Sequence, residues 1–142
     1  MKAAIEQIPQ IAPMVKELWP EHSVEALEKI LQEYICGEES AVFVNRMDGR
    51  IAGIALCCLR HDYVEGCESS PVGYLEGIFV QEEQRRKGIA AALCRECESW
   101  AKEMGCSEFA SDCELSNTDS LRFHLGIGFQ EENRIICFKK QI

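Results

Sequence analysis

A basic turn at the start of an apolar helical pattern carries the clearest chemical signal in this sequence. The first amide N–H groups of a helix have no partner inside the helix, and the helix dipole attracts negative charge there. Gly88 has no side chain that would keep a ligand away from the backbone. The stretch predicts an anion site, with a phosphate group as the natural ligand. The same sequence pattern would also be found in a solvated basic turn before an ordinary helix. The residues of the stretch are Arg85, Arg86, Lys87, Gly88, Ile89 and Ala90.

Two carboxylates lie at unusual places in predicted strands. Glu76 stands inside the apolar run 74–80, and Asp112 ends the run 108–112. An ionisable side chain in an apolar strand is costly unless it lines a cleft or has a partner. Glu76 therefore indicates either a carboxylate that faces a ligand or a structural ion pair. Asp112 is open to two interpretations as well, as a ligand-binding carboxylate or as a turn residue that caps the next loop.

The elements around these residues predict an α/β fold. A mixed central sheet, an antiparallel meander running into a βαβ unit, is flanked by helices. The apolar run 51–59 predicts a central strand that is buried on both faces. Ser23 and Asn117 predict helix N-caps, Gly105 predicts the end of a helix, and Asp48-Gly49 predicts a hairpin turn. Strands are expected at 41–46, 51–59, 74–80, 108–112 and 134–140, with a weak one at 2–7, and helices at 9–18, 24–36, 89–104 and 118–125.

Composition limits the classes of function. The 142 residues suit one domain spanning 1–142, and the formal net charge of −9 disfavours a general nucleic-acid or anionic-membrane binder. The acidic balance suits a cationic substrate, although solubility alone would explain it equally well. The sequence has no apolar stretch long enough for a membrane span and no apolar run at its N-terminus. We therefore expect a cytoplasmic protein.

Nine cysteines form no recognisable metal or disulfide pattern. The only pair spaced as CxxC is Cys94 and Cys97, which falls inside the predicted helix 89–104. No second CxxC or spaced histidine pair completes a zinc site. Without a secretion signal a disulfide framework is not expected. We expect no metal, and we expect most of the cysteines to be small buried apolar side chains.

The basic turn resembles a known cofactor motif. Arg85-x-x-Gly88-x-Ala90, after a strand and opening a helix, is similar to the acyl-CoA motif of the GNAT N-acetyltransferases. The order of predicted elements along nearly the whole chain also resembles that family. The resemblance implies acetyl-CoA as co-substrate, with its pyrophosphate held by amides of the turn. It also implies that Asn117 contacts the pantetheine arm, and that the backbone of Ile78, Phe79 and Val80 binds the pantetheine and the thioester carbonyl.

Four separated segments resemble aminoglycoside 6′-N-acetyltransferases more narrowly. They are Trp19-Pro20-x-His22, the run 60–67 (RHDYVEGC), the run 75–80 (LEGIFV) and Ala110-Ser111-Asp112. This resemblance implies transfer of an acetyl group to the 6′-amine of an aminoglycoside. It makes Glu76 and Asp112 catalytic and substrate-binding carboxylates, in an order that the sequence does not give. It also makes Trp19, His22 and Tyr63 walls of the substrate site.

Other interpretations remain at this stage. His124 stands where many GNAT enzymes carry a tyrosine proposed as general acid, and it could be either an acid or a packing residue. The protein could acetylate another amine, such as a polyamine or a protein amino group, or bind CoA as a non-catalytic sensor. By resemblance we expect a homodimer with the C-terminal strand at the interface, with no nucleic-acid or membrane partner.

Overall fold

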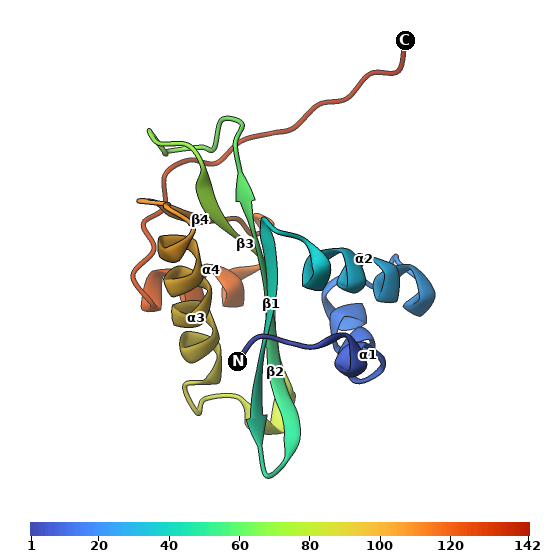
Figure 1. The fold of residues 1–142 in the computed structure, drawn as a ribbon. Coiled ribbons are helices and arrows are strands. Elements are labelled where there is room, and N and C mark those ends of the chain that lie inside the picture. Colours follow the sequence, from blue (N-terminus) through green and yellow to red (C-terminus); the bar gives the residue numbers. More distant parts are fainter.

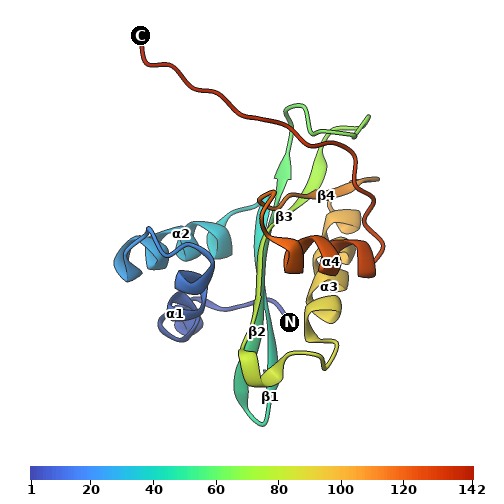
Figure 2. The ribbon, with the colours of Figure 1, turned by 180° about the vertical axis from the view of Figure 1, so that it is seen from behind.

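The computed structural model describes residues 1–142 as a four-stranded sheet between two layers of helices (Figure 1). Helices α1 and α2 cover one face, and α3 and α4 cover the other, as the reverse view also shows (Figure 2). The elements are α1 (Ile8–Leu18), α2 (Val24–Cys36), β1 (Ser40–Met47), β2 (Arg50–Arg60), β3 (Val72–Val80), α3 (Ile89–Glu103), β4 (Phe109–Ser111) and α4 (Thr118–Gly126), with short 3-10 helices at Ile5–Gln7 and Glu82–Gln84.

The sheet has the order β1-β2-β3-β4. Strands β1, β2 and β3 pair antiparallel, and β3 pairs parallel with β4 across the α3 crossover. The predicted meander and βαβ unit are therefore confirmed. The parallel pairing is short, because it joins only Gly73–Leu75 to Phe109–Ser111. Beyond Leu75, β3 runs on without a neighbour on that side.

Two apolar clusters hold the layers together, one on each face of the sheet. Leu93, Cys97 and Trp100 of α3 pack on one face, and Ile11 and Val15 of α1 belong to the cluster on the other. All seven residues of the run 51–57 in β2 are buried, which confirms the prediction of a central strand covered on both sides. An almost continuous apolar run is what a strand buried on two faces requires.

Helix ends follow the predicted local signals. The Oγ atom of Ser23 accepts a hydrogen bond of 3.1 Å from the amide of Ala26, which confirms the N-cap of α2. The side chain of Asn117 accepts in the same way from the amide of Ser120, at the start of α4. Gly105 follows α3 with φ of 90°, a left-handed conformation that glycine adopts without strain.

A β-bulge interrupts β3 at Glu76. Leu56 lies opposite Gly77 and Cys57 lies opposite Leu75, so Glu76 is an extra residue with no partner in β2. A bulge bends the strand and redirects a side chain. The neighbouring residues Glu76 and Gly77 consequently both face the layer of α1 and α2. A Cβ atom at Gly77 would lie 3.0 Å from Leu18 of α1 and 3.5 Å from the Trp19 ring.

The structure corrects two strand predictions at the chain ends. Residues 2–7 form only one bridge, between Lys2 and Phe43, followed by the 3-10 helix. The predicted strand 134–140 is not formed. Residues 129–142 have no regular structure, and the C-terminal end of this segment extends away from the domain (Figure 1). An apolar alternating run gives a strand only where a neighbour strand accepts its hydrogen bonds, and this tail has none. No helix of the structure is both long enough and apolar enough to cross a membrane.

The cysteine prediction is only partly correct. All nine cysteines are free, and four of them (Cys57, Cys94, Cys97 and Cys106) are buried as expected. Cys58 and Cys67 are half-buried, whereas Cys36, Cys113 and Cys137 are exposed. The buried ones lie on β2, on α3 and just after it, where a small apolar side chain fills the core between the helix and the sheet.

Candidate active site

Six consecutive amide groups at the start of α3 donate to no acceptor in the protein. They belong to residues 86–91, whose N–H groups make neither a backbone nor a side-chain hydrogen bond; the first amide that is paired again is that of Ala92, which donates to the carbonyl of Gly88. Gly88 is the N-cap residue and has φ of 77°, in the left-handed region. The loop therefore presents a run of free donors at the positive end of a helix dipole, which suits a diphosphate.

Two of the three cationic side chains of this loop are hydrogen-bonded to other groups of the protein. The Nε atom of Arg85 donates to the carbonyl of Val80 at 3.0 Å, and the Nζ atom of Lys87 donates to Gln84 Oε1 at 2.8 Å. Arg86 makes no hydrogen bond and has φ of 63°, which is uncommon for a residue with a side chain. The side chains thus shape the loop, and the backbone supplies the donors for an anion.

The outer edge of β3 offers a second set of backbone groups. The amide of Gln81 donates to the carbonyl of Ala52 in the direction of β2. Because successive amides of a strand point in opposite directions, the amides of Ile78 and Val80 face the other edge, and that of Phe79 faces β2. β4 ends at Ser111, beside Leu75, so this edge is open beyond that point. The free amides lie between the loop 85–88 and Glu76.

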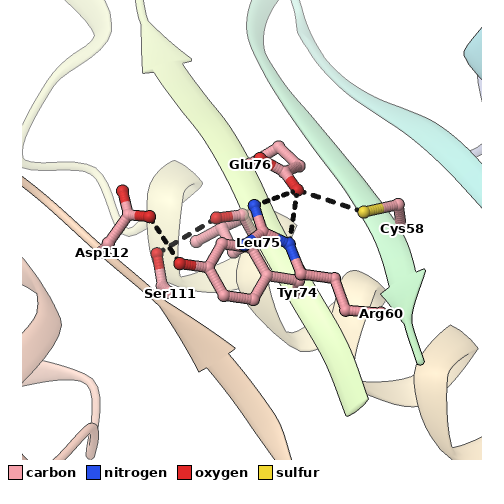
Figure 3. Close-up of polar contacts among 7 residues, drawn as sticks. All are labelled: Cys58, Arg60, Tyr74, Leu75, Glu76, Ser111 and Asp112. Carbon is pink, nitrogen blue, oxygen red and sulfur yellow. Dashed lines mark hydrogen bonds and ion pairs between the residues drawn. The ribbon is translucent and has the colours of Figure 1, made fainter. Parts of the chain in front are cut away.

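Glu76 is held in an ion pair on the α1/α2 face. Its Oε1 atom accepts hydrogen bonds from Arg60, at 3.1 Å from Nε and 2.7 Å from Nη2, and it lies 3.1 Å from the thiol of Cys58 (Figure 3). Its Oε2 atom accepts no hydrogen bond from the protein. The structural ion pair that the sequence left open is therefore present, and it engages only one of the two carboxylate oxygens.

Tyr74 joins Arg60 to the second carboxylate. The Cζ atom of Arg60 lies 3.4 Å from the centre of the Tyr74 ring, and the Tyr74 hydroxyl donates to Asp112 Oδ2 at 2.5 Å (Figure 3). Burial, together with the hydrogen bond and the charge of Asp112, raises the pKa of Tyr74 above its ordinary value. The phenol therefore stays protonated and donates. Glu76 and Asp112 are therefore connected through Arg60 and Tyr74, a connection that the sequence did not predict.

The surroundings of Glu76 disfavour any further negative charge. Burial, followed by the hydrogen bond and the charge of Glu76, raises the pKa of the Cys58 thiol to about 12. Burial and the charge of Glu76 likewise raise the pKa of Tyr34, which reaches the same place from α2. The pKa of Arg60 is also raised: burial of its guanidinium opposes the positive charge, but the hydrogen bond and the charge of Glu76 outweigh it. Arg60 is thus the group that compensates the carboxylate.

The predicted substrate walls lie at different distances from this network. Trp19 follows α1 and packs over Gly77, beside Glu76. His22 lies in the turn after Trp19, which Lys16 fixes with a hydrogen bond of 2.6 Å from its Nζ atom to the His22 carbonyl. Tyr63 is different, because its side chain is 79 % exposed and makes no hydrogen bond. The structure therefore brings Trp19 to Gly77, next to Glu76 in the chain, and leaves Tyr63 exposed on the loop 61–71.

The loop 61–71 is anchored by a carboxylate from outside it. One oxygen of Glu108 accepts hydrogen bonds from the amides of Glu68 and Ser69, at 2.9 and 2.8 Å, and from the Ser69 hydroxyl. The hydrogen bonds from the Ser69 hydroxyl, the Ser69 amide and the Glu68 amide lower the pKa of Glu108 below its ordinary value. The anchor fixes the C-terminal half of the loop, whereas Tyr63 lies in the other half.

His124 lies on the opposite face of the sheet from Glu76. Its Nε2 atom is 2.8 Å from the Ser111 hydroxyl, its Nδ1 atom is 2.6 Å from the Ser120 carbonyl, and the Ser111 hydroxyl donates to the Leu75 carbonyl at 3.1 Å. Both carbonyls can only accept. The Ser120 hydroxyl also lies 3.3 Å from Nδ1, so each ring nitrogen has a hydroxyl partner that can either donate or accept. The ring also packs against Phe129, with the centroids 5.1 Å apart.

The sequence interpretation missed four members of this site: Tyr34, Cys58, Arg60 and Tyr74. In the sequence Arg60 is only the first residue of the segment 60–67 and lies outside the predicted strand 51–59, whereas in the structure it is the last residue of β2. A signal for the pairing did exist, because residues 58, 60, 74 and 76 alternate on two adjacent antiparallel strands and so share one face. The bulge at Glu76 hides that register in the sequence.

Comparisons with known proteins agree with this geometry. Residues 5–129 match the acetyltransferase (GNAT) family. An aminoglycoside N(6′)-acetyltransferase type 1 from Serratia marcescens is 43 % identical over 126 residues, which cover 88 % of this chain and 86 % of that protein. The crystal structure of the aminoglycoside N-acetyltransferase AAC(6′)-Iy in complex with CoA superposes with a TM-score of 0.96 at 36 % identity, over 99 % of this chain and 93 % of the other.

A second structure of AAC(6′)-Iy contains the bisubstrate analogue CoA-S-monomethyl-acetylneamine. It superposes with a TM-score of 0.95 at 36 % identity and covers 100 % of this chain and 97 % of the other. Both the family match and the curated relatives span most of the sequence, including the loop at the start of α3 and the two carboxylates. The chain therefore belongs to the acetyltransferase (GNAT) family.

Proposed function

We propose that this protein is an aminoglycoside 6′-N-acetyltransferase that takes its acetyl group from acetyl-CoA. The observation that carries the proposal is the pair of carboxylates, Glu76 on β3 and Asp112 just after β4, connected through Arg60 and Tyr74 where the edge of β3 becomes open. Relatives that are named for this activity cover nearly the whole chain, which supports the same conclusion. The chain then acts as one acetyltransferase domain.

The cofactor end is built mainly from backbone. The free amides of residues 86–91 fit the diphosphate of acetyl-CoA, with Gly88 at the point of closest approach. The open amides of Ile78 and Val80 suit the pantetheine amides and the thioester carbonyl. There they would stabilise the negative charge that develops on the carbonyl oxygen. The Asn117 side chain caps α4 through its oxygen, which leaves its NH₂ group for the pantetheine arm.

The acceptor end is built from side chains. Acetyl transfer needs a neutral amine, whereas the aminomethyl group of a sugar is protonated near neutral pH. Glu76 then accepts the proton of the ammonium on its free Oε2 atom, directly or through a water, and Asp112 orients the amine. Trp19 and His22 form a wall of this site, and Tyr63 joins it when the loop 61–71 contacts a ligand. The net charge of −9 attracts a polycation.

The departing thiolate needs a proton, and in this proposal His124 supplies it. Its ring lies on the α4 side of Ser111, so the amine and the thiolate would stand on opposite faces of the sheet, joined through the opening where β4 stops. The Ser111 hydroxyl would then pass a proton from the imidazole. Replacement of His124 by Gln tests this role, because a structural histidine would alter stability and leave the pH profile of kcat unchanged.

The activity is tested by thiol release from acetyl-CoA. We expect release with kanamycin, and none with a gentamicin component that lacks an accessible 6′-amine. Spermidine serves as a third acceptor. Release with spermidine alone would keep the fold and cofactor and overturn the acceptor, and binding of acetyl-CoA without release to any of the three would favour a sensor of CoA.

We also propose a homodimer in which the C-terminal tail contacts a second copy. Ile136 and Phe138 are 81 % and 91 % exposed, and β4 leaves a free edge on the sheet. The tail stays close to its own domain only as far as Asn133, whose Nδ2 atom donates to Glu65 at 2.7 Å. An exposed apolar segment and an open sheet edge are both surfaces that are expected to pair with another chain. A cytoplasmic location stays a prediction from the sequence.

Light scattering measures this assembly. The full chain should have the mass of a dimer, and the double variant Ile136→Ser/Phe138→Ser should have the mass of a monomer. The variant Lys139→Ser/Lys140→Ser, which changes polar neighbours in the same tail, should remain dimeric. A monomeric full chain at assay concentration would contradict the proposal.

A further inference from the structure

Arg60 occupies the place in this site that the chemistry assigns to a substrate ammonium group. Its guanidinium is bound to Glu76 Oε1 and lies over the face of Tyr74, whose hydroxyl is bound to Asp112 (Figure 3). We propose that Arg60 is a displaceable counterion, which neutralises Glu76 in the free enzyme and swings away when the ammonium of the acceptor arrives. This inference rests on the proposed function and adds a residue that selects among acceptors.

The position of the guanidinium offers what a primary ammonium requires. It combines a carboxylate oxygen with an aromatic face, and both attract a cation. Glu76 Oε1 already accepts three contacts, from Nε and Nη2 of Arg60 and from the Cys58 thiol. An ammonium that approaches Glu76, at Oε1 or at the free Oε2, would lie close to the guanidinium, and the two positive charges would repel each other. The ammonium and Arg60 therefore compete.

Arg60 has few other contacts to hold it. Its side-chain hydrogen bonds go to Glu76 alone, and its side chain is 41 % exposed, against 21 % for that of Glu76. It is the last residue of β2 and adjoins the loop 61–71, so the long side chain can turn into solvent without disturbing the sheet. The carboxylate is the more buried partner, and it would remain in place to receive the new cation.

The exchange explains why an arginine stands beside a catalytic carboxylate. A charged carboxylate in a half-buried strand is costly without a partner. Arg60 is that partner in the free enzyme, and the ammonium of the acceptor takes its place on binding. An acceptor with one ammonium must replace the guanidinium with a single contact, whereas a polycation also gains from the surrounding negative charge. Arg60 thus favours polycationic acceptors over simple amines.

Kinetics of two variants test the exchange. Arg60→Gln removes the charge and keeps a side chain of similar shape, and Arg60→Lys keeps the charge. We expect Arg60→Gln to lower the KM for kanamycin about threefold to tenfold, since the competitor is gone, with the KM for acetyl-CoA unchanged and Arg60→Lys near the wild type. If Arg60 instead stays bound to Glu76 throughout the reaction, Arg60→Gln should lower kcat, and Arg60→Lys should keep kcat near that of the wild type. That result would contradict the proposal.

Nuclear magnetic resonance of the wild-type protein gives a second test that needs no variant to fold. The Arg60 Nε–H resonance should report a bonded group in the free protein, and it should move to the position of a solvated arginine when kanamycin is added in the presence of CoA. The backbone amide of Asp112 reports saturation independently. If kanamycin saturates the site and the Arg60 resonance stays, the inference is wrong.

The two proposals fail differently. If the wild-type enzyme releases no thiol with kanamycin, the proposed aminoglycoside activity is wrong. The resonance experiment is then repeated with methylammonium in place of kanamycin. Tetramethylammonium at equal ionic strength is the control. A shift with methylammonium alone would keep Arg60 as a displaceable counterion for another amine. No shift with either would overturn that role as well.

Discussion

The two halves of the proposed active site are built by different means. At the start of α3 the amides of residues 86–91 are free, and the nearby side chains of Arg85 and Lys87 are occupied. Around Glu76 the backbone is part of the sheet, and the side chains of Arg60, Tyr74 and Asp112 are paired with each other. The cofactor half thus has backbone amides without hydrogen-bond partners, whereas the side chains of the acceptor half are already paired and have to exchange partners when a substrate binds.

This difference predicts how each half responds to substitution. A site made of backbone depends on the conformation of a few residues and tolerates changes of side chain. A site made of paired side chains depends on each member, because removal of one leaves another unpaired. The same distinction separates changes in the affinity for acetyl-CoA from changes in the rate of transfer.

The largest expected effect is on the rate of transfer. Glu76→Gln keeps the shape of the side chain and removes its capacity to accept a proton, so kcat should fall about a hundredfold or more. The dissociation constant for acetyl-CoA, measured by calorimetry, should stay within about twofold, because the backbone half is untouched.

Asp112→Asn serves as the matched variant for that experiment. It should raise the KM for kanamycin more than it lowers kcat, because Asp112 orients the amine in this proposal. An unchanged kcat in Glu76→Gln, with folding verified by thermal unfolding, would remove Glu76 from the role of base.

A smaller effect is expected from the conformation of one residue in the cofactor half. Gly88→Val forces a β-branched residue to adopt φ of 77°. Such strain costs about 1–3 kcal/mol, so the affinity for acetyl-CoA should fall about tenfold or more while the KM for kanamycin changes little. No atom lies within 4 Å of a Cβ at Gly88, so the effect would come from the backbone and not from a clash.

Arg86→Asn is the control for the backbone interpretation. It removes a cation from the same loop, and asparagine tolerates the φ of 63° found at this position. We expect its affinity for acetyl-CoA to stay within about threefold of the wild type. A loss as large as that in Gly88→Val would mean that the cation and not the amides binds the cofactor.

The smallest effect is a difference in thiol reactivity within the acceptor half. Because the thiolate is the reactive form and the pKa of Cys58 is raised to about 12, alkylation of Cys58 should be slow at pH 8 and should rise with pH toward that value. The exposed Cys36, Cys113 and Cys137 should react at pH 8. Mass spectrometry of iodoacetamide-treated protein separates these sites.

The Glu76→Gln variant sharpens the thiol experiment. It removes a negative charge that raises the pKa of Cys58, so the alkylation of Cys58 should begin at a lower pH in this variant. Equal rates for Cys58 and Cys36 in the wild type at pH 8 would show that the thiol is not held by the carboxylate.

The difference between a half built from backbone and a half built from paired side chains also explains what the sequence could predict. The glycine at position 88 is detectable because only the backbone matters there and the apolar steps of α3 follow directly. Glu76 and Asp112 were predicted as residues, but their partners were not. The pairing of Glu76 with Arg60 joins residues sixteen positions apart in the sequence and passes through a bulge that no local pattern reports.

The chain ends show a second limit of local patterns. Residues 134–140 have the apolar character of a strand, yet a strand also needs a neighbour, and the sequence does not say whether one is present. Residues 2–7 form a single bridge to β1 for the same reason. By contrast, the caps Ser23 and Asn117 and the turn at Asp48-Gly49 depend on contacts within a few residues, and all three were predicted correctly.

The free amides at the start of α3 have a consequence for inhibition. An inhibitor that places an anionic group on residues 86–91 would bind atoms that every amino acid except proline shares. A substitution in this loop changes the side chain and leaves those donors in place, unless it replaces Gly88. Few single substitutions would therefore abolish the binding of such a compound. A compound that depends on the side chain of Arg60 or Tyr63 could lose its contacts through one substitution.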